Sequence, residues 1–107
     1  MDTKTYNAYL FPIAGVQFHQ YKSALELNIS AGAELSLVLE PENQYDDKAV
    51  AIYWEGIMLG YVPKKEAELK DKLYEVSIED KVRCVLTEVN EEETSYRMFK
   101  CIVEVEN

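Results

Sequence analysis

Two alternating segments near the C-terminal end constrain the fold most. The segments "DKVRCVLTEVN" (80–90) and "SYRMFKCIVEV" (95–105) place apolar residues at every second position, which is typical of strands with one buried face. A hairpin centred between Glu92 and Glu93 would give that face an apolar side chain at each step, and a slip by one residue would remove it. The opposed pairs predicted by this register are Val82 with Val103, Cys84 with Cys101, and Leu86 with Phe99.

The remaining apolar runs also have the lengths of strands. A strand is expected over 5–18, with Pro12 at an edge or bulge, and another over 34–40, where leucines alternate with polar residues. The segment 48–62 reads as two strands joined by a tight turn at Glu55 and Gly56.

One window, 63–76, has the pattern of a short amphipathic helix. Pro63 suits its first position, and the pairs Glu66–Lys70 and Glu68–Lys72 have the i,i+4 spacing of exposed ion pairs. Its apolar stripe consists of Leu69, Leu73 and Val76. The chain is therefore predicted to be a single mainly-β domain over 1–107, a small closed or nearly closed β-barrel of about six strands with one short α-helix.

Composition narrows the class of function. A chain of 107 residues with 48% hydrophobic residues can form a core without a metal or a disulfide. No apolar run approaches a membrane span, and the N-terminal segment "MDTKTYNAYLF" has no signal-peptide pattern, so a cytoplasmic protein is expected. The net charge of −9 argues against a broad phosphate-binding surface. Most of the acidic excess lies in 26–59 and 75–107, which leaves room for one small neutral or basic groove.

The titratable residues give little support for catalysis. His19 is the single histidine, and no nucleophile motif, phosphate loop or zinc spacing accompanies it, so we expect no enzyme activity, cofactor or metal. Glu40, Glu42, Asp46 and Asp47 lack the alternating spacing of a calcium loop. Directly opposed cysteines have Cβ atoms about 4.5–5.5 Å apart, slightly wide for a disulfide. Buried thiols are expected, and a redox pair is the alternative.

The segment "EPENQYDDKAV" (40–50) combines acids with an amide and an aromatic ring. One interpretation is a plain turn, built by Pro41 and Asn43 with Asp46 capping backbone N–H groups, while Tyr45 covers one end of the barrel. The other interpretation is the rim of a binding site. The residues by themselves leave both open.

The longer stretch "LVLEPENQYDDKAVAIYWEGIMLGYVPKK" resembles the signature of the HIRAN domain family. In that signature a strand ends in Glu-Pro or Asp-Pro and is followed by Asn-x-Tyr-Asp, then by a small residue and a β-branched residue. Later positions hold a glycine, then an aromatic residue or His, then Val or Leu. A lysine that opens a helix follows. The segment "GVQFH" (15–19) falls where the family has a glycine followed by an aromatic pair. The resemblance is clear over 13–75 and looser over the last two strands.

The resemblance implies a modified OB-like barrel that holds the 3′ end of single-stranded DNA and functions in DNA repair or processing. In DNA-binding members an aromatic pair stacks on terminal bases, the Asp and Asn of the motif meet the terminal 3′-hydroxyl and nucleotide, and basic groups hold phosphates. The residues that take these positions are Phe18, His19, Asn43, Tyr45, Asp46, Tyr61 and Lys64.

This chain departs from the family pattern at several positions. Gln17 stands where DNA-binding members carry an arginine, and Glu42 and Asp47 add negative charge beside Asp46. Weak, salt-dependent binding of single-stranded DNA is therefore expected.

The alternative is a protein-interaction module that uses the same groove and the acidic surface. If Lys22, Lys64 and Lys65 converge on the groove, DNA is favoured; if they scatter, a protein partner is. A third possibility, DNA mimicry by the acidic surface, has no supporting pattern.

Overall fold

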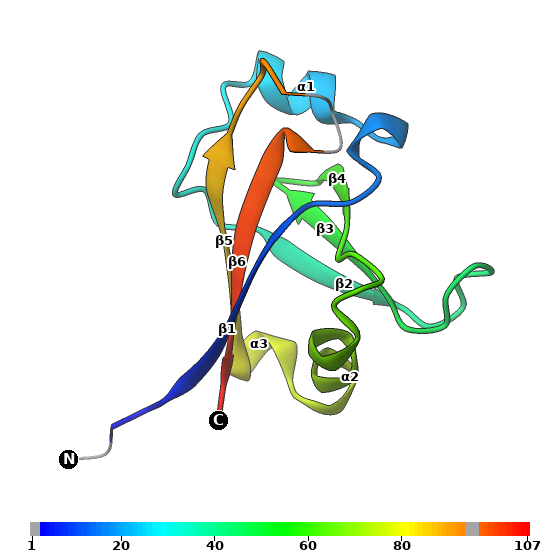
Figure 1. Cartoon of the computed structure of the whole chain (residues 1–107), viewed down its shortest axis with the longest axis vertical. Helices are drawn as coiled ribbons and strands as arrows, with labels where there is room; N and C mark the ends of the chain where they lie inside the picture. Colours follow the sequence, from blue (N-terminus) through cyan, green and yellow to red (C-terminus); the bar gives the residue numbers. More distant parts are fainter. Residues whose placement is uncertain (1–2, 94–96) are drawn as a thin grey trace.

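The computed structural model describes residues 3–93 and 97–107 and contains two three-stranded antiparallel sheets (Figure 1). The first sheet has the strand order β1-β6-β5, and the second has the order β2-β3-β4. The mainly-β class and the six expected strands are confirmed. The strands are β1 Tyr6–Pro12, β2 Ser36–Glu40, β3 Ala49–Trp54, β4 Ile57–Tyr61, β5 Val82–Val89 and β6 Phe99–Glu106.

The two sheets meet along two seams, and each seam contains one isolated β-bridge. At the first seam Ala14 and Tyr61 exchange two backbone hydrogen bonds, both with N···O distances of 2.9 Å. At the second seam Glu34 lies opposite Val85. The expected barrel is not confirmed, because one bridge per seam does not make a continuous ladder around the molecule.

The predicted C-terminal hairpin is present, but its register differs by two residues. Because strand side chains alternate with a period of two, this shift keeps the same face inward, and the apolar pattern cannot distinguish the two registers. A β-bulge between Leu86 and Glu88 shifts the pairing further toward the turn. Ser95 and Tyr96 of the expected second strand lie outside the described residues. The observed pairs include Val82 with Val105, Cys84 with Val103, and Leu86 with Cys101.

The changed register also separates the cysteines. Cys84 and Cys101 are not directly opposed, and both are buried free thiols. A hydrogen bond with Cys84, together with burial, raises the pKa of the Cys101 thiol. A thiol with a raised pKa is a poor nucleophile, so the arrangement is that of core residues.

The turn between β3 and β4 lies where the sequence predicted it. Glu55 has φ of 46° and Gly56 has φ of 80°, and positive values at both central residues are typical of a two-residue type I′ hairpin. β1 ends earlier than expected, at Pro12, and the chain leaves the sheet at Gly15, which has φ of 72°.

Helices lie at both ends of the two sheets (Figure 1). The predicted helix is α2, Ala67–Glu75, and it starts four residues later than expected because 63–66 forms a turn in which the Glu66 N–H donates to the Pro63 carbonyl. Leu69 and Leu73 are fully buried and join the core. Three further elements were not predicted: the 3₁₀ helix η1 Val16–Phe18, α1 Tyr21–Glu26 and α3 Ile78–Lys81.

Within the described part of the chain, no helix combines the length and apolar character that a membrane span requires.

Candidate functional site

A pocket of about 700 Å³ lies beside the first seam, between the end of β4 and the loop 41–48. All seven residues predicted from the sequence line it, although they come from three separate segments of the chain. The lining residues are Ala14, Gly15, Phe18, His19, Asn43, Tyr45, Asp46, Ala49, Tyr61, Val62 and Lys64.

The segment around η1 forms one wall of the pocket. The left-handed conformation of Gly15 turns the chain out of β1 and into η1. Phe18 then projects with 78% of its surface exposed, so it does not belong to the core. The His19 ring packs edge-on against the Tyr61 ring, with 5.6 Å between centroids and an interplanar angle of 62°. The expected aromatic pair is thus split: Phe18 is free and His19 is supported by Tyr61.

Asn43 builds the opposite rim. Its side-chain carbonyl accepts hydrogen bonds from the backbone N–H groups of Tyr45 (2.9 Å) and Asp46 (3.2 Å), and its amide donates to Glu40 (3.0 Å). This is the turn expected from an asparagine that bonds to its own backbone. The turn leaves Tyr45 80% exposed, so Tyr45 does not cover an end of the sheets. The turn interpretation is confirmed for Asn43, and the same turn places Asn43, Tyr45 and Asp46 in the lining of the pocket.

Asp46 is held from two sides. Its Oδ1 accepts a hydrogen bond from the backbone N–H of Lys48 at 2.9 Å. Its Oδ2 accepts a hydrogen bond from the Nζ of Lys70, a residue of α2. The Lys70 hydrogen bond, then the Lys48 backbone hydrogen bond, and the nearby positive charges of Lys70 and Lys64 hold the pKa of Asp46 below its ordinary value. The expected exposed pair between Lys70 and Glu66 is wrong, because Lys70 is buried and pairs with Asp46.

Tyr61 is fixed in the neutral, hydrogen-bonding form. Its hydroxyl donates to Glu40 Oε1 at 2.8 Å. Burial, followed by the hydrogen bond and charge of Glu40, raises the pKa of Tyr61 to about 12. The same Glu40 oxygen also accepts a hydrogen bond from the Asn43 amide. Glu40 therefore connects the Tyr61 side of the pocket with the Asn43 side.

The sequence analysis did not predict that three residues support the pocket: Glu40, Lys70 and Tyr74. Tyr74 donates to the Ala49 carbonyl at 2.6 Å and accepts from the Glu40 N–H at 3.2 Å, so it ties the ends of β2 and β3 together. Lys70 and Tyr74 are four residues apart and share one side of α2. The available signal was the position of Lys70 three residues before Leu73, which places it beside the buried stripe, where a lysine needs an acidic partner.

The lysines converge only in part. Lys64 lines the pocket, whereas Lys22 and Lys65 are exposed and do not line it. Lys70 adds a positive charge behind Asp46 that the sequence analysis had placed on the surface.

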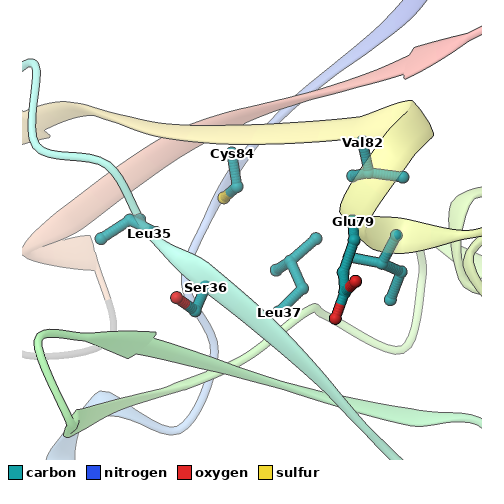
Figure 2. Close-up of a pocket in the computed structure, with 7 residues that line it drawn as sticks. Leu35, Ser36, Leu37, Glu79, Val82 and Cys84 are labelled. Atoms are coloured by element: carbon teal, nitrogen blue, oxygen red, sulfur yellow. The ribbon is translucent and has the colours of Figure 1, made fainter.

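A second pocket, of about 350 Å³, lies at the other seam and contains none of the predicted site residues (Figure 2). Figure 2 shows Leu35 and Cys84 on the two segments that face each other across this seam, with Glu79 of α3 beside Leu37. Its lining is mainly aliphatic, with one carboxylate. In the regions that the structure describes, no cluster of His, Cys, Asp or Glu has an arrangement that could hold a metal ion.

The lowered pKa of Asp46 predicts a specific loss of stability in acid. A carboxylate of this kind contributes stability above its unfolded pKa of about 3.9 and loses it as the pH falls through the lower, folded pKa. The unfolding free energy should therefore decrease below about pH 4. Urea unfolding between about pH 3 and pH 6 measures this. The variant carrying Asp46→Asn and Lys70→Met should lose less stability over that range, and an equal loss would contradict the prediction.

Comparison with known proteins agrees with this architecture. The model of the HIRAN domain family matches residues 6–106. A protein from Lactobacillus plantarum, known from its crystal structure, superimposes with a TM-score of 0.68 at 16% identity, covering 96% of this chain and 99% of that one. The HIRAN domain of human HLTF gives a TM-score of 0.61 at 16% identity, covering 96% and 77%. A comparison with curated protein sequences gives no match.

Identity this low establishes a shared fold, whereas the family model matches the sequence itself along most of the chain. The chain therefore belongs to the HIRAN domain family, a family of DNA-binding domains.

Proposed function

We propose that this domain binds the 3′ end of single-stranded DNA in the 700 Å³ pocket, as a recognition module in DNA repair or processing. The observation that carries the proposal is the convergence of all seven motif residues on one pocket, from segments as far apart as 18–19 and 61–64. The distance along the chain between these segments does not by itself require them to line one pocket.

The two exposed aromatic rings suit unpaired bases. Phe18 and Tyr45 both line the pocket and are 78% and 80% exposed. Base stacking on such rings is worth about 1–3 kcal/mol per base and is independent of sequence. Removing aromatic rings of this size from water is favourable. The two rings therefore favour a ligand with flat apolar faces.

The polar groups suit a terminal hydroxyl. Asp46 keeps free lone pairs, since each carboxylate oxygen accepts more than one hydrogen bond, and a carboxylate repels a phosphate group. Lys64 stands where it can pair with a phosphate further along the strand. The pocket should therefore prefer a strand that ends in a 3′-hydroxyl.

A protein partner is the second candidate. It is favoured by the net charge of −9 and by the positions of Lys22 and Lys65 away from the pocket. The same exposed aromatic rings could pack against apolar side chains of a partner. The two candidates differ in their response to salt, because contacts between lysines and phosphates weaken steeply as salt is added.

The rim aromatics give the first test. Phe18→Ala and Tyr45→Ala should each weaken binding of a short fluorescent single strand about tenfold, from the loss of about 1–3 kcal/mol of stacking. Tyr6→Ala is the matched control, because Tyr6 is also exposed (48%) but does not line the pocket. Fluorescence anisotropy at low salt measures all three variants. Equal effects of Tyr45→Ala and Tyr6→Ala would place the DNA elsewhere.

A further inference from the structure

Lys70 is the one buried charged residue in the described part of the chain, with 5% of its surface exposed. A buried lysine normally loses its charge unless an acid pairs with it. Its Nζ meets Asp46 Oδ2, inside the binding loop of the proposed site. The pair therefore connects the core side of α2 with a pocket residue.

The position of Lys70 is fixed by the packing of α2. Leu69 and Leu73 anchor the helix in the core. The loop is attached to the same helix by two more contacts of Lys48: its ammonium group lies 4.0 Å from Asp71 and 5.1 Å from the centre of the Tyr74 ring. Lys70 thus holds Asp46 from a rigid element, whereas the backbone N–H of Lys48 belongs to the loop itself.

We infer that Lys70 is a positioning residue that gives the pocket its preference for a free 3′-hydroxyl, by fixing the carboxylate of Asp46 in the orientation and charge state that accept this hydroxyl. The inference rests on the proposed function. It assigns selectivity to a residue that lies outside the lining of the pocket.

The charge of Lys70 matters most once DNA is bound. Phosphates near the pocket would raise the pKa of a lone carboxylate, and a protonated Asp46 would no longer repel a 3′-phosphate. The positive groups that act on Asp46 are Lys70 and, more weakly, Lys64. Two further acids of the same loop, Glu42 and Asp47, are near enough to α2 that their charges, after burial, help to raise the pKa of Tyr74. Lys70 is the buried group among them, so solvent ions screen it least.

The first arm of the test needs no DNA. The pKa of the Asp46 carboxyl is measured by NMR titration in the unmutated protein, in Lys70→Met and in Lys72→Met. Lys72 is the matched control, because it lies on the same helix but faces the Tyr9 ring at 5.7 Å. The inference predicts a pKa below the ordinary value in the unmutated protein and in Lys72→Met, and a rise in Lys70→Met. An ordinary pKa in the unmutated protein would overturn the inference without any variant, even if Lys70→Met failed to fold.

The second arm compares strands of one sequence that end in a 3′-hydroxyl or a 3′-phosphate. We expect a preference of about tenfold for the hydroxyl in the unmutated protein, retained by Lys72→Met and reduced to less than about threefold in Lys70→Met. A general loss of affinity for both strands is what a merely structural or long-range charge effect would give, and it would overturn the inference. Absence of binding by the folded, unmutated protein would instead overturn the proposed function, and the selectivity role with it. A preference that Lys70→Met keeps would overturn the role of Lys70 alone.

Discussion

Replacing Asp46 by Asn should lower the free energy of unfolding by about 3 kcal/mol. The substitution keeps the size of the side chain but leaves the Lys70 ammonium, which is almost fully buried, without a compensating charge. The opposite change, Lys70→Met, should cost less, because the side chain of Asp46 is 22% exposed and water can solvate it. Urea unfolding followed by circular dichroism measures each value.

Two controls separate the ion pair from other effects. The double variant, Asp46→Asn with Lys70→Met, should recover most of the loss, since removal of both charges leaves no buried ion. Asp47→Asn should change stability by less than about 0.5 kcal/mol, because Asp47 is an exposed neighbour with the same chemistry. Additive losses in the double variant would mean that the two residues are not coupled.

Gly60→Ala should also destabilise the domain strongly, by about 2–3 kcal/mol. A Cβ at this position would lie 2.3 Å from the carbonyl oxygen of Ala14 and 2.9 Å from a methyl carbon of Ile13. Ala14 forms the bridge to Tyr61 that holds the first seam, and both residues line the pocket. The change should therefore open the seam as well as strain the backbone.

The glycine in the β3–β4 turn provides the comparison. Gly56 also has a positive φ, 80°, but an added Cβ there would meet nothing within 4 Å. Gly56→Ala should cost only about 1 kcal/mol, from backbone strain alone. Thermal unfolding of both variants, with amide hydrogen exchange at Ala14 and Tyr61, distinguishes the two causes. Similar losses in the two variants would show that the close contact at Gly60 is relieved without opening the seam.

Features that follow from local pattern were predictable from the sequence. The turn at Glu55 and Gly56, the alternation of the C-terminal hairpin and the apolar stripe of α2 all depend on neighbouring residues. The hairpin register was not predictable, because a shift by two residues preserves the buried face, and the alternating pattern does not reveal the bulge between Leu86 and Glu88.

Features that depend on contacts between distant segments of the chain were harder to predict from the sequence. The resemblance to the family named the pocket residues, but it gave no indication that Lys70 supports Asp46 or that Glu40 joins Tyr61 to Asn43. The pattern of α2 placed Lys70 in a surface pair, because an i,i+4 acid is present and the partner on the loop is 24 residues away. Such pairings are decided by how α2 packs, which periodicity does not encode.

The Asp46–Lys70 pair also determines how the function should be tested. Asp46→Asn alters stability as well as chemistry, so a loss of DNA binding in that variant has two explanations. Changing the DNA instead of the protein avoids this difficulty. Strands with different 3′ ends meet the same folded pocket.

The most direct measurement is therefore fluorescence anisotropy of the unmutated protein at low salt, with single strands of one sequence that end in a 3′-hydroxyl or a 3′-phosphate. A circular single strand without ends serves as the control. An end-reading pocket predicts binding of the 3′-hydroxyl strand about tenfold tighter than the 3′-phosphate strand, with the circular strand weakest or unbound. Equal affinity for all three strands, or no binding by the folded protein, would contradict the account.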